Sequence, residues 1–109
     1  MELVELAKQY FIFFSNKDIK NLKNLFSENV ILKDWEIEAK GINEVVEANK
    51  KIFNSFESII ATPKNIYQDN FVLICVIEIL INKTEILNVI DILKFDKNKK
   101  IEDITAFKQ

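Results

Sequence analysis

Histidine and arginine are absent from the 109 residues, and glycine, proline and cysteine occur once each. Without histidine, the chain offers no imidazole ligand for a metal ion and no histidine to activate a serine or cysteine nucleophile. A single glycine excludes a glycine-rich phosphate-binding loop. The single cysteine, Cys75, excludes an internal disulfide bond and fits a reducing compartment, so we expect a cytoplasmic protein in which Cys75 fills an apolar position.

Composition limits the chain to one small domain, residues 1–109. Hydrophobic residues make up 49% and charged residues 29%, which is typical of a soluble globular protein. The net charge of −2 provides no basic surface for nucleic acid or an anionic membrane. The most apolar segment, residues 71–81, is too short to span a bilayer and contains Glu78, so we expect no membrane partner. Abundant lysine, isoleucine and asparagine without arginine indicate an AT-rich, bacterial genome.

The spacing of apolar residues predicts three helices. The first covers residues 2–15. Asp18 is placed to cap a second, short helix, and Gly41 opens the third. The third helix presents an apolar stripe to the core, and one polar residue, Asn49, also falls on that stripe. Asn49 is expected either to line a pocket or to satisfy a buried backbone group.

Apolar segments separated by turn residues predict the strands. Residues 27–29 are expected to turn into a first strand that ends near Trp35, followed by a loop or short hairpin over residues 36–40. Four longer strands follow at residues 57–67, 71–81, 85–95 and 100–108. The order of elements, ααβαββββ, indicates an α+β domain in which a curved sheet wraps a long helix.

Three polar residues occupy positions where this periodicity calls for apolar ones: Tyr10, Asp34 and Asp91. Tyr10 falls on the buried stripe of the first helix, and Asp34 follows Leu32 on one side of the first strand. Asp91 lies in the middle of the apolar face of the strand at 85–95. Because a buried acid is costly unless it is paired, protonated or used, a phenol and two carboxyls facing one cavity indicate proton-transfer chemistry.

Each of the three residues also has a purely structural interpretation. Tyr10 alone would be a core aromatic residue with its hydroxyl at the edge of the core. Asp34 alone would be an acid of the turn that ends a strand. Asp91 alone would be a buried acid paired with a lysine or a backbone amide.

With these residues the chain resembles the bacterial ketosteroid isomerases, within the superfamily of nuclear-transport-factor-2-like domains that includes the SnoaL-like polyketide cyclases. The resemblance is carried by QYFIFFSNKDIKNLKNLFSENVILKD and NVIDILKFDKNKKI. Tyr10 falls on the oxyanion tyrosine of that family and Asp34 on its general base. Asp91 falls on its second, protonated carboxyl group, and Gly41 matches the glycine that opens the third helix.

The resemblance implies a cone-shaped mixed sheet around the N-terminal helix and a shift of a double bond in an unsaturated ketone. Asp34 would carry the proton, while Tyr10 and protonated Asp91 would hold the enolate oxygen. The ligand would be a small hydrophobic carbonyl compound, and the reaction needs neither a metal nor an organic cofactor. The expected pocket residues are Phe11, Phe14, Leu32, Trp35, Asn49, Val89, Leu93 and Phe107.

Several positions depart from the isomerase pattern. Trp35 replaces the proline that usually follows the general base, and Lys108 falls where an apolar wall is expected. Phe26 and Asn49 stand where some isomerases have tyrosines that support the oxyanion tyrosine. These departures favour a smaller enone or a polyketide-like ketone over a steroid. A non-catalytic ligand-binding domain and a SnoaL-like cyclase, which needs only an acid such as Asp34, remain the alternatives.

The back of the sheet is expected to be covered by a second copy of the chain. The segment 71–81 is apolar on both faces, and Ile86, Ile90 and Ile92 form an apolar face opposite Asp91. Since monomers rarely expose a large apolar patch, we expect a homodimer through the sheet backs, as the resemblance also implies. Membrane attachment through this face is the alternative.

Overall fold

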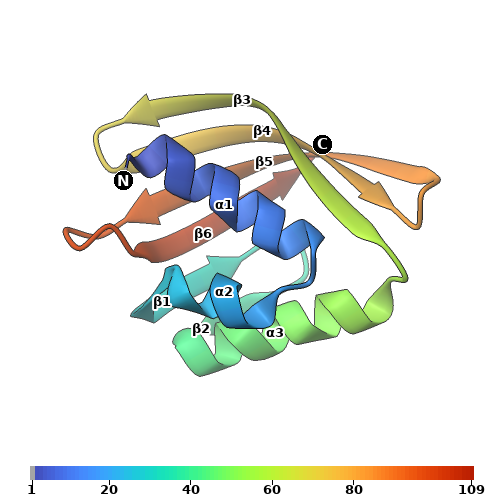
Figure 1. Cartoon of the computed structure of the whole chain (residues 1–109), viewed down its shortest axis with the longest axis horizontal. Helices are drawn as coiled ribbons and strands as arrows, with labels where there is room; N and C mark the ends of the chain where they lie inside the picture. Colours follow the sequence, from blue (N-terminus) through green and yellow to red (C-terminus); the bar gives the residue numbers. More distant parts are fainter. Residues whose placement is uncertain (1) are drawn as a thin grey trace.

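A curved six-stranded sheet carries the helices α1 and α3 on its concave side, and α2 connects α1 to the first strand (Figure 1). The structure is a computed structural model that describes residues 2–109. The helices are α1 (Leu3–Ser15), α2 (Ile19–Asn24) and α3 (Ile42–Ser55). The strands are β1 (Phe26–Lys33), β2 (Glu38–Lys40), β3 (Ile59–Asp69), β4 (Val72–Ile81), β5 (Glu85–Phe95) and β6 (Ile101–Lys108). The predicted α+β class and curved mixed sheet are confirmed.

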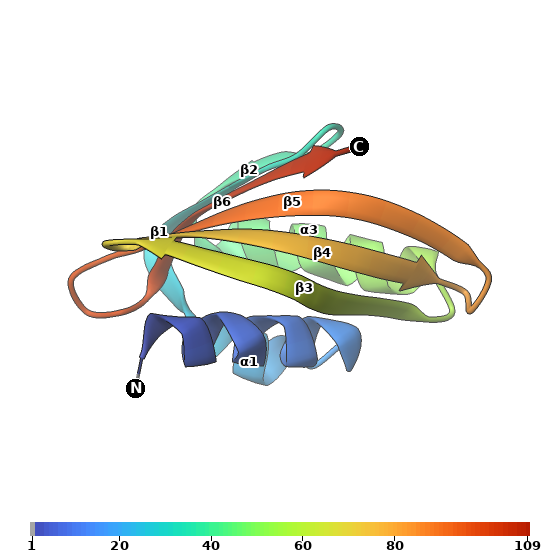
Figure 2. The ribbon, with the colours of Figure 1, turned by 90° about the horizontal axis from the view of Figure 1, so that it is seen from above.

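The strands follow the order β2-β1-β6-β5-β4-β3, and every neighbouring pair is antiparallel except β1 and β6. The parallel pairing of β1 with β6 brings the turn after β1 next to the C-terminal strand. Irregularities in register interrupt β1, β3 and the pairing of β5 with β6. Such bulges increase the local twist, which helps the sheet to curve around α1 (Figure 2).

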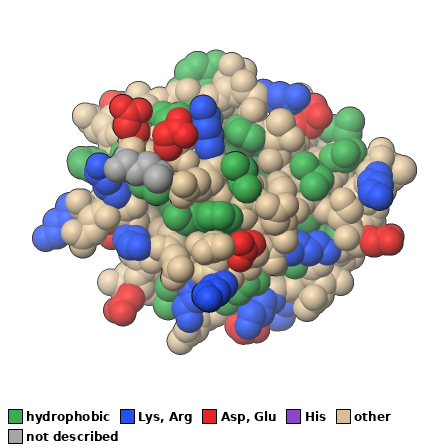
Figure 3. Space-filling view, viewed as in Figure 1, with side chains coloured by type: hydrophobic (Ala, Val, Ile, Leu, Met, Phe, Trp, Pro, Cys, Tyr) green, Lys and Arg blue, Asp and Glu red, His purple; other side chains and the backbone are tan. Residues whose placement is uncertain are grey.

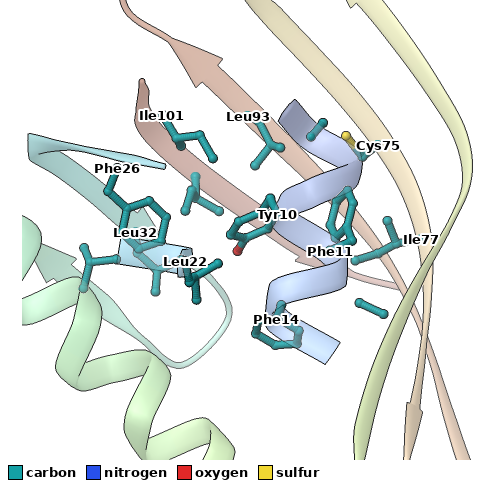
Figure 4. Packing of buried hydrophobic residues seen from close by; sticks show 14 of the residues in the cluster. Tyr10, Phe11, Phe14, Leu22, Phe26, Leu32, Cys75, Ile77, Leu93 and Ile101 are labelled. Atoms are coloured by element: carbon teal, nitrogen blue, oxygen red, sulfur yellow. The ribbon is translucent and has the colours of Figure 1, made fainter. Parts of the chain in front are cut away.

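The alternation of side chains along β4 and β5 decides which residues face the helices. Leu73, Cys75 and Ile77 face the concave side and are buried, and they lie opposite Leu93, Asp91 and Val89 of β5. Aromatic side chains of α1 pack onto this layer, as Figure 4 shows for Tyr10, Phe11 and Phe14. The residues between them on β4 and β5 face the convex side, which no helix covers (Figure 2).

Two strands, β1 and β3, have bounds that differ by two residues or more from the predicted ones. Residues 27–29 are not a turn, because β1 already begins at Phe26 and includes them. Within this part of the strand, the register of β1 against β6 shifts. The same strand ends at Lys33 rather than near Trp35, because the amide of Asp34 donates to the carbonyl of Ile37 and closes the connection to β2. Strand β3, which was predicted at residues 57–67, is shifted by two residues and runs from Ile59 to Asp69.

The helix ends follow local chemistry. The Asp18 side chain accepts a hydrogen bond from the amide of Asn21 and caps α2, as predicted. Gly41 precedes α3 with φ of 88°, a conformation that other residues rarely adopt. Among residues 2–109, no helix is both long and apolar enough to cross a bilayer.

Candidate functional site

A cavity of about 390 Å³ opens between α1, α3 and the concave face of the sheet. This volume lies at the small end of the range for ligand pockets, about 300–1,000 Å³. The walls are largely aliphatic and aromatic. The polar side chains on the lining are Tyr10, Asp34, Glu36, Asn49, Glu85, Asp91 and Lys108.

Tyr10 enters the cavity from α1. Its ring is buried against Phe11, with ring centres 5.1 Å apart in an edge-on contact, and it also packs near Phe14 and Phe26. In Figure 4 the hydroxyl points away from the α1 backbone, and within residues 2–109 it has no hydrogen-bond partner. Burial, and after it the negative charge of Asp91, raises the pKa of Tyr10 well above its ordinary value. The phenol is therefore a neutral hydrogen-bond donor at physiological pH.

Asp91 faces the same cavity from β5 and is only 7% exposed. It lies opposite Cys75 on β4 and Ala106 on β6, and neither residue has a positively charged side chain that could pair with the carboxylate. No lysine or backbone amide of the described chain pairs with this carboxyl group, so the structural interpretation considered from the sequence does not apply. Burial, and to a smaller extent the charge of Asp34, raises the pKa of Asp91 to about 7. The carboxyl group of Asp91 therefore keeps its proton to a much higher pH than an exposed aspartate does, and in that neutral form it can donate a hydrogen bond.

Asp34 lies at the end of β1, in the turn that leads to β2. Its Oδ1 accepts hydrogen bonds from the amides of Glu36, at 2.8 Å, and Ile37, at 2.6 Å. These two bonds fix the orientation of the carboxylate, while Oδ2 has no hydrogen-bond partner in the described chain and the residue lines the cavity. Asp34 thus closes a turn with one oxygen and keeps the other available.

The three groups influence one another across the cavity. The charge of Asp34 contributes to the raised pKa of both Tyr10 and Asp91, and the charge of Asp91 contributes to that of Tyr10. The site therefore offers two hydroxyl donors, from Tyr10 and neutral Asp91, together with one carboxylate acceptor. Such a set can hold a carbonyl oxygen and accept a proton from a carbon next to it.

Six of the eight pocket residues expected from the sequence lie on the cavity wall. They are Phe11, Phe14, Leu32, Trp35, Asn49 and Val89. Leu93 was wrongly predicted to line the pocket, because it is fully enclosed in the core beyond Asp91 on β5.

Phe107 was also wrongly predicted to line the pocket, because it is 55% exposed and lies opposite Ile90 on the convex face. Simple alternation counted from Ile101 would turn residue 107 inward. The register of β6 against β5 shifts between Lys94 and Phe95, so the alternation of β6 changes between Ile101 and Asp103, and both Ile101 and Ile104 are buried. Ala106 and Lys108 consequently face the cavity in place of Phe107.

Other cavity residues were missed from the sequence. Alternation along β4 could have identified Ile77, Ile79 and Ile81, which share a face with Cys75. The rim residues Glu36 and Glu85 had no comparable signal, because exposed acids at strand ends and turns are common, whereas Lys108 lies on the wall where the resemblance led us to expect an apolar residue. At this rim the Nζ of Lys108 lies 5.6 Å from the ring centre of Trp35.

Charged side chains of both signs are interspersed on the face that carries the helices, and no large area of a single charge is visible (Figure 3). Among the described residues, no group of three or more cysteine, aspartate and glutamate side chains is placed to hold a metal ion.

No protein-family model matches the sequence, and no curated protein matches it either. Solved structures do match over nearly the whole chain. A nuclear-transport-factor-2-like protein of unknown function from Cytophaga hutchinsonii superposes with a TM-score of 0.85 at 9% identity, covering 100% of this chain and 91% of that one. A protein described as a candidate SnoaL-like polyketide cyclase, from Shewanella denitrificans, gives 0.85 at 11% identity, covering 98% and 90%.

A candidate ketosteroid isomerase from Kribbella flavida gives a TM-score of 0.81 at 15% identity, covering 96% of this chain and 76% of that one. At such identities the likeness establishes the fold and nothing finer. The chain has the nuclear-transport-factor-2-like, or cystatin-like, cone fold, and its structural neighbours include SnoaL-like cyclase and isomerase candidates.

Proposed function

We propose that this chain is an isomerase of the ketosteroid-isomerase kind, which moves a carbon–carbon double bond into conjugation with a ketone. One observation carries the proposal. Tyr10, Asp34 and Asp91 come from three different elements, face one apolar cavity, and leave a phenol, a neutral carboxyl and one carboxylate oxygen without partners in the described chain. An unpaired buried acid is costly, and stabilising an enolate would offset that cost.

In the proposed reaction, Oδ2 of Asp34 removes the proton from the carbon between the carbonyl group and the double bond. The electron pair moves onto the carbonyl oxygen, where the hydroxyl of Tyr10 and the protonated carboxyl of Asp91 donate hydrogen bonds to it. Asp34 then returns the same proton to the far carbon of the former double bond, and the carbonyl group re-forms. The proton count is unchanged and no external oxidant is required.

Two rim residues favour a compact ketone over a full steroid. Trp35 stands where the isomerases usually have proline, and Lys108 stands where they have an apolar wall; the Nζ of Lys108 lies 5.6 Å from the Trp35 ring centre. We therefore expect a monocyclic or bicyclic enone, or a ketone of the polyketide type.

Two other functions have observations of their own. The hydrogen bonds from Glu36 and Ile37 give Asp34 a structural role in its turn, which favours a non-catalytic ligand-binding domain. Structural similarity to a candidate polyketide cyclase favours a SnoaL-like cyclase, in which Asp34 alone would remove a proton from a more acidic carbon.

We also propose that the convex face of the sheet binds a second copy of this chain. Val76, Ile90 and Phe107 lie side by side across β4, β5 and β6, and Ile90 and Phe107 are exposed. Glu78 lies on one side of this apolar row and Lys94 towards the other end. If two copies pack face to face about a two-fold axis that exchanges the two ends of the row, Glu78 of each copy lies near Lys94 of the other. This pairing of opposite charges argues for self-association.

The test of the isomerase is ultraviolet detection of conjugation with two β,γ-unsaturated ketones, one steroidal and one monocyclic. Turnover should occur with the monocyclic ketone and disappear in Asp34→Asn, which keeps the acceptor for the turn amides but loses the base. Glu28→Gln, which removes an exposed acid of β1 that does not line the cavity, is the matched control and should retain turnover.

Binding of naphthol, as a mimic of the enolate, separates the remaining possibilities. Binding without turnover of either ketone would contradict the isomerase and favour the ligand-binding domain. Turnover that survives Asp34→Asn would show that another group is the base. Absence of both binding and turnover would overturn the proposed site.

A further inference from the structure

Asn49 is the most deeply buried polar side chain on the cavity wall that the proposed reaction does not use. It lies on α3 and is 2% exposed. Its Nδ2 donates a 2.9 Å hydrogen bond to the carbonyl of Val45, one turn earlier in the helix. This bond fixes the orientation of the amide group, because the atom facing a carbonyl oxygen must be the donor.

The other amide atom, Oδ1, is left as an unpaired acceptor directed at the cavity. No donor of residues 2–109 bonds to it, yet no fully enclosed side-chain nitrogen or oxygen of these residues lacks a partner. Oδ1 must therefore be reachable from the open space of the cavity, which Asn49 lines. A ligand that donates a hydrogen bond to this acceptor gains affinity, because the acceptor otherwise has no partner in the described chain.

The charges around the cavity restrict the ligand further. Four carboxyl groups, those of Asp34, Glu36, Glu85 and Asp91, lie on the lining against the single ammonium group of Lys108. None of the four is in a salt bridge within the described chain, and Lys108 lies over the Trp35 ring. Even with Asp91 protonated, three carboxylates remain against one ammonium group, so an anionic ligand would be repelled.

We propose that the cavity selects a ketone that is not anionic and bears a hydroxyl group, and that Asn49 determines this specificity by accepting the hydroxyl hydrogen through Oδ1. The inference rests on the proposed function, because it assumes that Tyr10 and Asp91 hold the ketone oxygen. The hydroxyl group then lies on the part of the ligand that faces α3. Asn49 is a specificity-determining residue here and takes no part in the proton transfer.

The test uses calorimetry to compare the affinities of the protein for four kinds of naphthalene compound. Naphthol presents only the enolate-like oxygen. Naphthalenediols carry a second hydroxyl at successive positions of the other ring, methoxynaphthols carry an acceptor there, and hydroxynaphthoic acids carry a carboxylate. The best diol should bind about threefold to tenfold more tightly than naphthol, the methoxy compound should lose this gain, and the acid should bind most weakly.

The variant Asn49→Leu should abolish the advantage of the diol and leave the affinity for naphthol within about twofold, since Leu has a similar shape without polar atoms. Asn54→Leu, an exposed asparagine on the same helix, is the matched control and should keep the advantage. A purely structural role for Asn49 would lower stability without changing the ratio of the two affinities.

The outcomes separate this inference from the function on which it rests. If naphthol and every diol bind with equal affinity, and Tyr10→Phe weakens all of them, the role of Asn49 is overturned while the enolate site stands. If no probe binds, both are overturned. Tight binding of the acid would overturn the exclusion of anions. The diol and naphthol comparison in the unaltered protein decides the question even if Asn49→Leu does not fold.

Discussion

Asp91 and Asp34 face one cavity from different elements, β5 and the turn after β1, and the charge of Asp34 adds to the effect of burial on Asp91. The two carboxyls are in contrasting surroundings. Asp34 accepts two backbone hydrogen bonds, whereas Asp91 has no partner in the described chain. In the proposed reaction, this contrast suits Asp34 to the role of the base and Asp91 to that of a hydrogen-bond donor.

The activity of the proposed isomerase should fall as the pH rises through about 7. Burial and the charge of Asp34 raise the pKa of Asp91 to about 7, and only the protonated form can donate to an enolate oxygen. A profile of kcat/KM against pH measures this loss. In Asp91→Asn, whose amide donates at every pH, the alkaline decline should disappear, and an unchanged decline in that variant would assign it to another group.

The stability of the fold should depend on pH through the same residue. The pKa of Asp91 rises from 3.8 to about 7 on folding, so its contribution to the free energy of unfolding is fully present below about pH 4 and is lost as the pH rises to about 7. The loss is on the order of 4 kcal/mol. We expect urea unfolding to show that the free energy of unfolding of the unaltered protein falls between about pH 4 and pH 7 relative to that of Asp91→Asn. Parallel curves for the two proteins would contradict the buried, unpaired state of Asp91.

Tyr10→Phe should lower kcat by about a hundredfold to a thousandfold, because it removes one of two donors to the enolate oxygen. The fold should not weaken, since the hydroxyl has no hydrogen-bond partner in the described chain and the ring contacts with Phe11 and Phe14 are kept. Steady-state kinetics and thermal unfolding together test this prediction. A large drop in the melting temperature would mean that the hydroxyl has a structural role.

Ile90→Lys should convert a homodimer to a monomer, because it places a charge in the middle of the apolar row on the convex face. Ile12→Lys is the matched control, since Ile12 is similarly exposed but lies on α1. Sedimentation equilibrium of both variants and the unaltered protein measures the change. A monomeric unaltered protein, or an Ile90→Lys variant that remains dimeric, would exclude this face as the interface.

The fold and the faces of Tyr10 and Asp91 could be predicted from the sequence, because periodicity fixes the face on which a residue lies within one element. Asp34 lies in the turn after β1, outside the strand whose alternation was used to place it. Tyr10 sits on a helical stripe of apolar residues, and Asp91 alternates with Val89 and Leu93 along β5. An acid or phenol on such an apolar face can be recognised from the local sequence alone. The order of helices and strands follows equally from local spacing and turn residues.

Periodicity predicted pocket residues wrongly in two situations: where a bulge changes the face on which a strand residue lies, and where a residue on the correct face lies too far from the cavity. Phe107 was assigned to the wrong face because the register shift between β5 and β6 reverses the alternation after Ile101. Leu93 shares the face of Asp91 but lies too deep in the core to reach the cavity. Alternation states the face of a strand and carries no information about how far each residue is from the opening.

The sequence by itself determined the class of fold and the presence of the phenol of Tyr10 and the carboxyl of Asp91 on apolar faces, since these depend on interactions between near neighbours in the chain. Only the tertiary structure decided which side chains share the cavity, that Asp91 has no partner among the described residues, and that Asn49 divides its amide between Val45 and the cavity. These depend on distances between elements far apart in sequence, which are set by sheet curvature and strand register.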